Sequence, residues 1–196
     1  ANVSLIGRLA YSFDDRYFLT ASWRRDYAGR LPKNKNHGDF PAVTVGWKIS
    51  NEAFFPKTDV VSLLKLRASW GRVGNLGSIG YNYRSAVLSK DSWQEQAQYG
   101  VEKNLLWDTF IYNSIALNNK LTWETSEQFD LGIDLNMFND RLAMQFDWFE
   151  KRTFDLIQTQ SMNWPGSIGL DPMLINQGEV RNRGIELSLN WNDRIN

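Results

Sequence analysis

Few residues in this sequence could carry out chemistry. The chain has no cysteine and a single histidine, His37, which excludes thiolate nucleophiles, disulfides and metal sites built from several histidines. Two carboxylate pairs, Glu124/Glu127 and Asp130/Asp134, have the residue type that general acid–base catalysis needs. On an extended strand, the two members of the second pair share a face but lie about 13 Å apart, and those of the first pair point to opposite faces. We therefore predict no enzyme, no catalytic residue, no metal ligand and no cofactor.

A glycine-rich segment, 71–80 (GRVGNLGSIG), suggests phosphate binding at first sight. It lacks the Lys-Ser/Thr pair and the following helix of a phosphate-binding loop. A strand end that runs into a pliable loop explains its glycines better. His37 lies among lysines and asparagines, with Asp39 nearby, and is expected to be an exposed loop residue.

The composition limits the kinds of partner. Lys+Arg and Asp+Glu number 22 each, so the formal net charge is +0 and no nucleic acid partner is expected. Aromatic residues are abundant, with 9 Trp, 7 Tyr and 11 Phe among 196 residues. No run approaches the roughly 18 apolar residues of a spanning helix, a test that does not detect the shorter, mixed strands of a membrane barrel.

Apolar and polar residues alternate with a period of two along most of the chain. In 128–137, for example, every second residue is apolar and the residues between are polar or glycine. The pattern predicts about seven strands and no long helix, with a short helical turn near SNEAFF capped by Ser50 or Asn51. The seven runs are 3–13, 17–24, 43–50, 63–71, 128–137, 142–148 and 184–192.

The connections between these runs differ sharply in length. Three share one short polar motif, at 14–16 (DDR), 139–141 (NDR) and 192–194 (NDR). If consecutive strands are antiparallel, all three motifs fall at one end of the sheet, together with 51–62. The long connections, 27–40, 72–120 and 153–183, then share the other end. Short turns at one end and long loops at the other are typical of outer-membrane barrels.

The two faces of the predicted strands differ in chemistry. One face carries Leu, Val, Ile and Ala between two belts of aromatic residues, which suits contact with lipid. Near the short turns lie Tyr11, Phe13, Tyr17, Trp47, Phe138 and Trp191, and nearer the long loops lie Trp23, Trp70, Trp123 and Trp148. The other face carries charged candidates for lining a lumen: Lys65, Arg67, Asp130, Asp134, Asp147 and Glu186. These six either contact a plug or passing substrate, or have a structural role only, as charge ladders between neighbouring strands or as solvated side chains.

Five stretches resemble the late barrel region of SusC/RagA-type TonB-linked outer-membrane transporters. The most specific blocks are ETSEQFDLGID (124–134) and GEVRNRGIEL (178–187), which combine a strand pattern with particular loop residues. The predicted fold class is accordingly all-β, an antiparallel transmembrane barrel segment of about seven strands. The five stretches are 15–26, 40–55, 65–75, 121–142 and 176–191.

The resemblance implies a 22-stranded barrel in the bacterial outer membrane, filled by an N-terminal plug. Such transporters take up oligosaccharides or peptides with energy passed from TonB, and a SusD-like surface lipoprotein closes over the mouth. Residues 1–196 would then be a partial barrel domain without the plug, the TonB-contacting segment or the closing strands. The implied partners are the SusD-like lipoprotein, TonB, outer-membrane lipid, and a glycan or peptide substrate.

Aromatic residues in the long loops are candidates for stacking on sugar rings or anchoring a protein partner. The alternative is that they pack the loops against themselves. They are Trp93, Tyr99, Trp107, Tyr112 and Trp164.

Two other functions stay open at this point. A soluble β-rich carbohydrate-binding or adhesion module would show the same alternation, with its aromatic face buried. A passive porin would share the barrel but lacks the resemblance described above.

Overall fold

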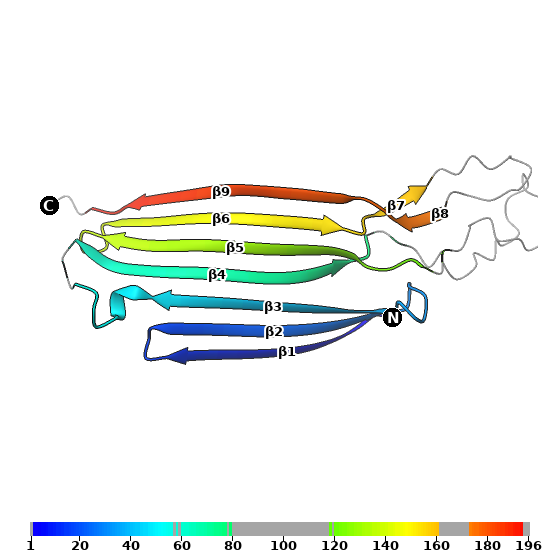
Figure 1. Ribbon diagram of the computed structural model, residues 1–196, viewed down its shortest axis with the longest axis horizontal. Coiled ribbons are helices and arrows are strands. Elements are labelled where there is room, and N and C mark those ends of the chain that lie inside the picture. The colour runs from blue at the N-terminus through cyan, green and yellow to red at the C-terminus, as the bar shows by residue number, and fades with distance from the viewer. Residues whose placement is uncertain are drawn as a thin grey trace, which may run out of the picture.

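The computed structural model describes residues 2–56, 58, 60–77, 79, 118, 120–160 and 173–193. Seven long strands form one antiparallel sheet in the order β1-β2-β3-β4-β5-β6-β9 (Figure 1). They are β1 (Asn2–Phe13), β2 (Tyr17–Ala28), β3 (His37–Lys48), β4 (Val61–Asn75), β5 (Glu124–Met137), β6 (Leu142–Phe154) and β9 (Glu179–Trp191). The predicted fold class, an all-β antiparallel sheet of seven strands, is confirmed.

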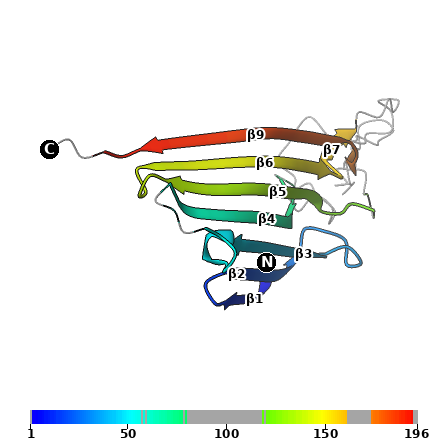
Figure 2. The ribbon, with the colours of Figure 1, turned by 60° about the vertical axis from the view of Figure 1, so that its left-hand side comes forward.

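The sheet is open. β1 and β9 lie at its opposite edges and do not pair with each other. After a turn of 60° the seven strands still form a single layer (Figure 2). Neither face of the sheet is therefore covered by a second sheet within the described ranges.

Several strands reach further toward the long-loop end than the alternation predicts. β2 continues to Ala28 and β3 begins at His37. His37 is exposed as predicted, but it is a strand residue, and its ring lies 6.0 Å from that of Tyr27. A second small sheet, β7 (Ile157–Gln160) with β8 (Met173–Asn176), was not predicted; it lies within the long 153–183 connection.

The short turns at 13–16 and 138–141 are built alike, although Phe138 has a positive φ of 57° and Phe13 does not. The two central residues of each have positive φ, between 49° and 64°. Asn and Asp adopt this left-handed conformation at less cost than other side chains do. In each turn the arginine N–H donates to the phenylalanine carbonyl three residues earlier, at 3.0 and 3.3 Å. The arginine carbonyl in turn accepts a bond from the end of the neighbouring strand: from the N–H of Lys48, the last residue of β3, in one turn, and from that of Asn192, just after β9, in the other.

The predicted asymmetry of the connections is confirmed. Both turns lie at the left-hand end of the sheet in Figure 1, where β9 also ends. Trp191 pairs with Leu142 there, and Arg141 lies 3.7 Å from Asp193 of the third motif. Arg194 falls outside the described residues. The long connections leave from the opposite end.

The expected helical turn is a 3-10 turn at Ile49–Asn51. The predicted cap is wrong, because the turn begins after Lys48 and has no side-chain cap. The Asn51 amide instead donates to the carbonyl and the carboxylate of Asp15, both at 3.0 Å. In the described part of the chain, no helix has the length and apolar character to span a membrane.

Buried apolar side chains gather at the long-loop end. The Phe40 ring packs against Gly38 and Gly74, where no Cβ would fit, and meets the Trp123 ring edge-on at 5.5 Å. Trp123 is only 9% exposed, so its predicted place in an aromatic belt is wrong. Ile157 of β7 and Leu174 of β8 pack against this core and attach the small sheet to the large one. The core consists of Ala28, Leu31, Phe40, Leu76, Ile79, Leu121 and Trp123.

Candidate functional site: a charged face and an apolar face

The strand register places all six predicted lumen residues on one face of the sheet. Residues directly opposite each other on paired strands have side chains on the same face. Arg67 lies opposite Gly132, Gly132 opposite Asp147, and Asp147 opposite Glu186. Lys65 lies opposite Asp134 in the next row. We call this side of the sheet the charged face and the other side the apolar face.

Arg67 is the centre of an ion cluster on the charged face. Its Nη2 lies 2.9 Å from Asp134 Oδ1 and 3.1 Å from Asp147 Oδ1. The guanidinium lies over Gly132, where a Cβ would come within 2.9 Å of Arg67 Cζ and would collide with Asp147. The missing side chain at Gly132 therefore makes room for a bridge across three strands, β4, β5 and β6.

The other charged candidates are placed less uniformly. Asp130 accepts a hydrogen bond from the Ser69 hydroxyl at 2.8 Å. Lys65 does not bind the opposite Asp134; its Nζ lies 4.9 Å from the centroid of the Phe18 ring. Glu186 makes no hydrogen bond or ion pair with any described residue. A cross-strand charge ladder thus exists around Arg67 but does not extend to all six residues.

The carboxylate pairs considered for acid–base chemistry have structural partners. Glu127 accepts a hydrogen bond from the Trp70 indole at 2.6 Å and pairs with Arg72. Glu124 accepts bonds from the Asn75 amide and from the N–H of Ile157, both at 3.4 Å. Among the described residues, no three His, Cys, Asp or Glu side chains are grouped so as to hold a metal ion.

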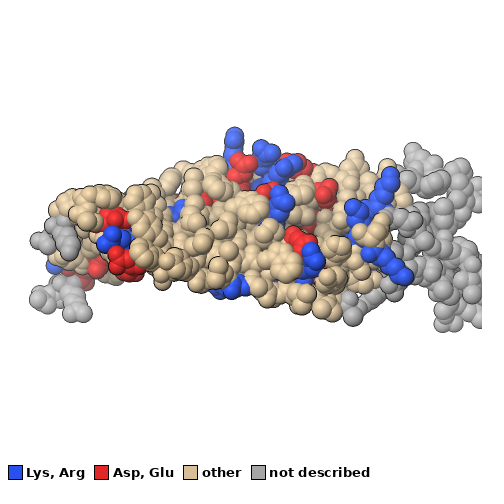
Figure 3. Space-filling view, turned by 60° about the horizontal axis from the view of Figure 1, so that its bottom comes forward, with Lys and Arg blue, Asp and Glu red and all other residues tan. Residues whose placement is uncertain are grey.

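The apolar face is exposed along most of its length. Ile185, Leu187 and Leu189 of β9 are each more than 60% exposed, and Leu131 in the middle of the sheet is 45% exposed. A hollow of about 900 Å³ lies mainly on this face, lined mostly by aromatic and aliphatic residues from β1 to β6, with Arg67 the one charged residue among the described residues that line it. The space-filling view shows a charged group at the short-turn end, a largely uncharged area next to it, and further charged side chains from the middle toward the long-loop end (Figure 3). The soluble-module alternative required this face to be buried, which it is not.

The charged border of the apolar face was missed in the sequence. Just beyond Trp23 and Trp70, toward the long loops, the same face carries five arginines from four strands. Carboxylates from neighbouring strands interleave with them, and Arg25 binds Asp39 through two bonds of 2.8 Å. The signal was present in the sequence, because the period of two continues past each tryptophan with Arg in place of Leu. We call Arg25, Arg72, Arg152, Arg181 and Arg183 the arginine row.

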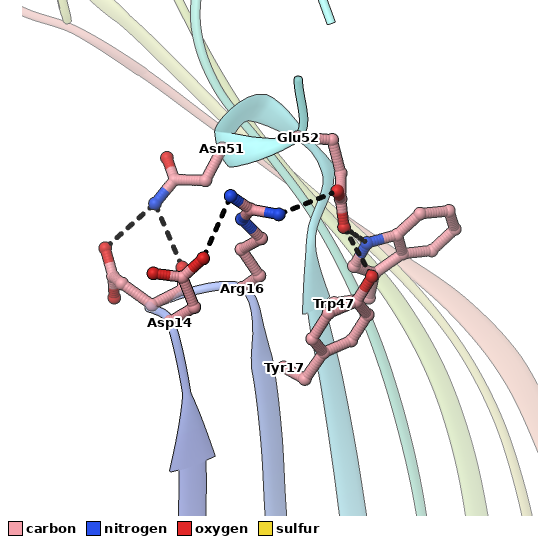
Figure 4. A network of polar contacts seen from close by, with 7 residues as sticks. Asp14, Arg16, Tyr17, Trp47, Asn51 and Glu52 are labelled. Atoms are coloured by element: carbon pink, nitrogen blue, oxygen red, sulfur yellow. Dashed lines mark hydrogen bonds and ion pairs between the residues drawn. The ribbon is translucent and has the colours of Figure 1, made fainter. Parts of the chain in front are cut away.

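At the short-turn end, Glu52 ties together the polar tips of two aromatic residues (Figure 4). Its Oε1 accepts bonds from the Tyr17 hydroxyl at 2.6 Å and from the Trp47 indole at 2.9 Å, and Arg16 lies 3.5 Å from its Oε2. The Tyr17 and Trp47 donors hold the pKa of the Glu52 carboxyl below its usual range. The segment after β3 is thereby fastened to the aromatic belt.

The loop aromatic candidates Trp93, Tyr99, Trp107, Tyr112 and Trp164 lie outside the described residues. Their assignment as contacts for substrate or partner stays a prediction.

Residues 1–196 match the family model described as TonB dependent receptor-like, beta-barrel. TonB-dependent receptor P39 of Formosa agariphila is 35% identical over 193 residues, which are 95% of this chain and 17% of that protein. TonB-dependent receptor SusC of Bacteroides thetaiotaomicron is 34% identical over 191 residues, 96% of this chain and 18% of that protein. The chain thus spans less than a fifth of the length of these relatives.

A solved structure of the RagAB peptide importer in its 'closed-closed' state matches the whole chain. The TM-score is 0.77 and the identity 28%, and the match covers 20% of that chain. The siderophore receptor PirA of Pseudomonas aeruginosa matches 96% of the chain with a TM-score of 0.58 at 13% identity, which shows a shared fold alone.

The exposed apolar face, the asymmetric turns and these matches agree. This chain belongs to the TonB-dependent receptor-like β-barrel family, is of the SusC/RagA type, and lies in the bacterial outer membrane.

Proposed function

We propose that residues 1–196 form seven adjacent strands of a larger, plugged barrel that imports a nutrient across the outer membrane. The apolar face meets lipid. The charged face lines the lumen, where Lys65, Arg67, Asp130, Asp134, Asp147 and Glu186 meet the plug, water or passing substrate. The strands supply the wall, and no residue acts in catalysis.

The observation that carries this proposal is the uncharged band on the apolar face. From Leu9 on β1 to Trp191 on β9, no strand residue of this face is charged until the arginine row begins. On β5 the band runs from Phe129 to Met137, about 26 Å of strand at 3.3 Å per residue. Membrane barrels carry an apolar band about 25 Å tall. In water so large an apolar patch would drive aggregation.

The band is also inclined to the strands, as a barrel wall requires. The residues paired in register across the sheet lead from Arg183, at the border on β9, to Ala21 on β2. The border residue on β2 is Arg25, four residues further toward the long loops. At the short-turn end, the paired residues lead from Tyr17 on β2 to Leu187 on β9. The band on β9 continues to Trp191, again four residues further. Four residues are about 13 Å, and five strand spacings are about 24 Å. Both borders thus incline by roughly 30°, close to the tilt of about 35–45° that strands adopt in membrane barrels.

Oligosaccharides or peptides are the proposed substrates, and a SusD-like surface lipoprotein is the proposed lid. The support is the similarity to a peptide importer, RagAB, and to SusC. The family name supports TonB as the energy source. The long connections, all at one end of the sheet, would face the lid.

Spin labels on neighbouring residues test the orientation of the two faces. Ile185→Cys and Glu186→Cys are introduced one at a time into the full-length transporter in lipid vesicles. A label at 185 should collide with oxygen dissolved in lipid, and a label at 186 with a water-soluble nickel chelate. The reverse order would overturn the assignment of the faces.

Uptake tests the transport function itself. Cells that express the full-length protein should accumulate a labelled oligosaccharide or peptide, and deletion of TonB should abolish the uptake. Uptake that persists without TonB would instead favour a passive porin.

A further inference from the structure

The arginine row lies at one border of the uncharged band only. At the other border the strands end in the aromatic belt, and the charged side chains there belong to turns. The two borders of the band therefore present different chemistry to the membrane surface. The row lies at the long-loop end. Under the proposed function, on which this inference rests, that end faces outward.

Several of the guanidiniums lie against the apolar face. Arg25 Cζ is 5.2 Å from the centroid of the Trp23 ring, Arg72 Cζ is 5.4 Å from that of Trp70, and Arg152 Cζ is 5.1 Å from that of Phe154. Cation–π contact of this kind holds the charge close to the ring. The positive charge is thus held at the edge of the hydrocarbon region.

The guanidinium groups of the arginine row are accessible to a ligand. Arg25, Arg72, Arg152 and Arg181 are between 36% and 55% exposed. Arg183 is exposed and makes no ion pair with any described residue. Five arginines face four carboxylates on this border, a local excess of one positive charge. The carboxylates are Asp39, Glu127, Glu150 and Glu179.

Stability alone does not account for the row. Exposed ion pairs contribute little to folding free energy. Arginine is, however, the side chain best suited to phosphate, because its planar guanidinium donates two parallel hydrogen bonds. At a membrane surface, basic side chains bind anionic lipid headgroups.

We infer that the arginine row binds the phosphate groups of lipid A, the phosphorylated glycolipid of the outer leaflet. The acyl chains would lie along the apolar face below the row, and the phosphates would bind the guanidiniums between the carboxylates. The occupant follows from charge and position, since a phosphate attached to acyl chains lies at the height of this border.

Native mass spectrometry of the full-length transporter in detergent tests the inference. The probes are bis-phosphorylated lipid A and the same lipid without phosphates. In the variant Arg72→Gln/Arg183→Gln, the affinity for the phosphorylated lipid should fall about tenfold or more. The matched control, Arg8→Gln/Lys151→Gln, removes the same charge from the other face and should bind as the parent does.

Either of two results would overturn phosphate binding by the row: equal affinity of the parent and the Arg72/Arg183 variant, or equal binding of the lipid with and without phosphates. If phosphatidylglycerol binds as tightly as lipid A, the row recognises anionic lipid in general and the assigned occupant is wrong. The spin-label experiment above separates these outcomes from a failure of the proposed orientation. Labels at 185 and 186 report the faces whether or not lipid A binds.

Discussion

At the scale of single residues, the short-turn end is held by carboxylates outside the strands. Glu52 binds Tyr17 and Trp47, Asp15 binds Lys48 at 2.8 Å, and Asp140 accepts from the Ser62 hydroxyl at 2.7 Å. The pKa of each of these three carboxyls is lowered by these donors, with Asn136 adding to the effect at Asp140. The ionised forms are therefore the ones that the fold stabilises.

A pH dependence follows from these lowered pKa values. A carboxyl whose pKa is lower in the folded state stabilises the fold above its unfolded pKa, and that contribution is lost as the pH falls through the folded pKa. The loss should begin near pH 4.5 for Glu52 and near 3.8 for Asp15 and Asp140. The thermal midpoint of the full-length protein in detergent should decrease once the pH is below these values. The decrease should be smaller in Glu52→Gln, which lacks one of the three carboxyls. An unchanged midpoint down to pH 3 would contradict this.

Gly132 is predicted to be intolerant of any side chain. In Gly132→Ala the new Cβ would displace the Arg67 guanidinium from Asp134 and Asp147. Overpacking of this kind costs about 1–3 kcal/mol, which a urea titration of the full-length protein in detergent would measure. Gly7→Ala is the control, since a Cβ there meets nothing within 4 Å. Equal stability of the two variants would show that Arg67 moves aside freely.

At the scale of elements, the same four-residue turn motif closes two different hairpins of the sheet. Phe-Asp-Asp-Arg at 13–16 and Phe-Asn-Asp-Arg at 138–141 share a positive φ at their two central residues and the hydrogen bond from the arginine N–H to the phenylalanine carbonyl. In both turns the carbonyl of the final arginine accepts a bond at the end of the neighbouring strand, from Lys48 of β3 or from Asn192 just after β9. The motif therefore closes a hairpin and also joins it to its neighbour.

The left-handed conformation of Asn139, with φ 56°, predicts how it responds to substitution. Asn139→Val should destabilise the hairpin by about 1–2 kcal/mol, because a β-branched side chain is strained at positive φ. Asn139→Gly should be nearly neutral or slightly stabilising. Urea unfolding of the full-length protein checks both variants. Equal stability of the two would mean that the turn adopts another conformation in solution.

The core at the long-loop end predicts a second effect at this scale. Phe40 is 6% exposed and joins β3 to Trp123 and the segment before β5. Phe40→Ala should cost about 3–5 kcal/mol locally and speed amide hydrogen exchange at residues 121–124. Phe54→Ala is the matched control, because Phe54 is 70% exposed. Unchanged exchange in Phe40→Ala would show that the core does not hold this end together.

At the scale of the whole molecule, the two faces should respond oppositely to charge. Leu131→Arg places a cation in the middle of the lipid-facing band, at a cost of about 2–4 kcal/mol near the bilayer midplane. Gln145→Arg places the same charge on the other face, in the row of Asp134. The amount of folded protein in outer-membrane fractions should fall for the first variant only. A loss in both, or in the second alone, would contradict the orientation.

The sequence by itself determined the seven long strands, apart from their exact ends, their antiparallel succession and the separation of the two faces; it did not reveal β7 and β8. These features depend on the period of two and on turn residues, which are local properties of the chain. Four consecutive residues, Phe-x-Asp-Arg, are enough to identify each of the two short turns. The lumen residues were placed on one face for the same reason, since alternation assigns faces without knowledge of partners.

Only the tertiary structure decided which side chains meet across the sheet. Arg67 binds Asp134 and Asp147, 67 and 80 positions away, whereas Lys65 turns to Phe18. Trp123 alternates like a belt residue but is buried by Phe40, because β3 extends beyond its predicted start and brings that ring inward. Such contacts depend on the register between strands that long loops connect. The residues near each end of such a loop do not encode that register.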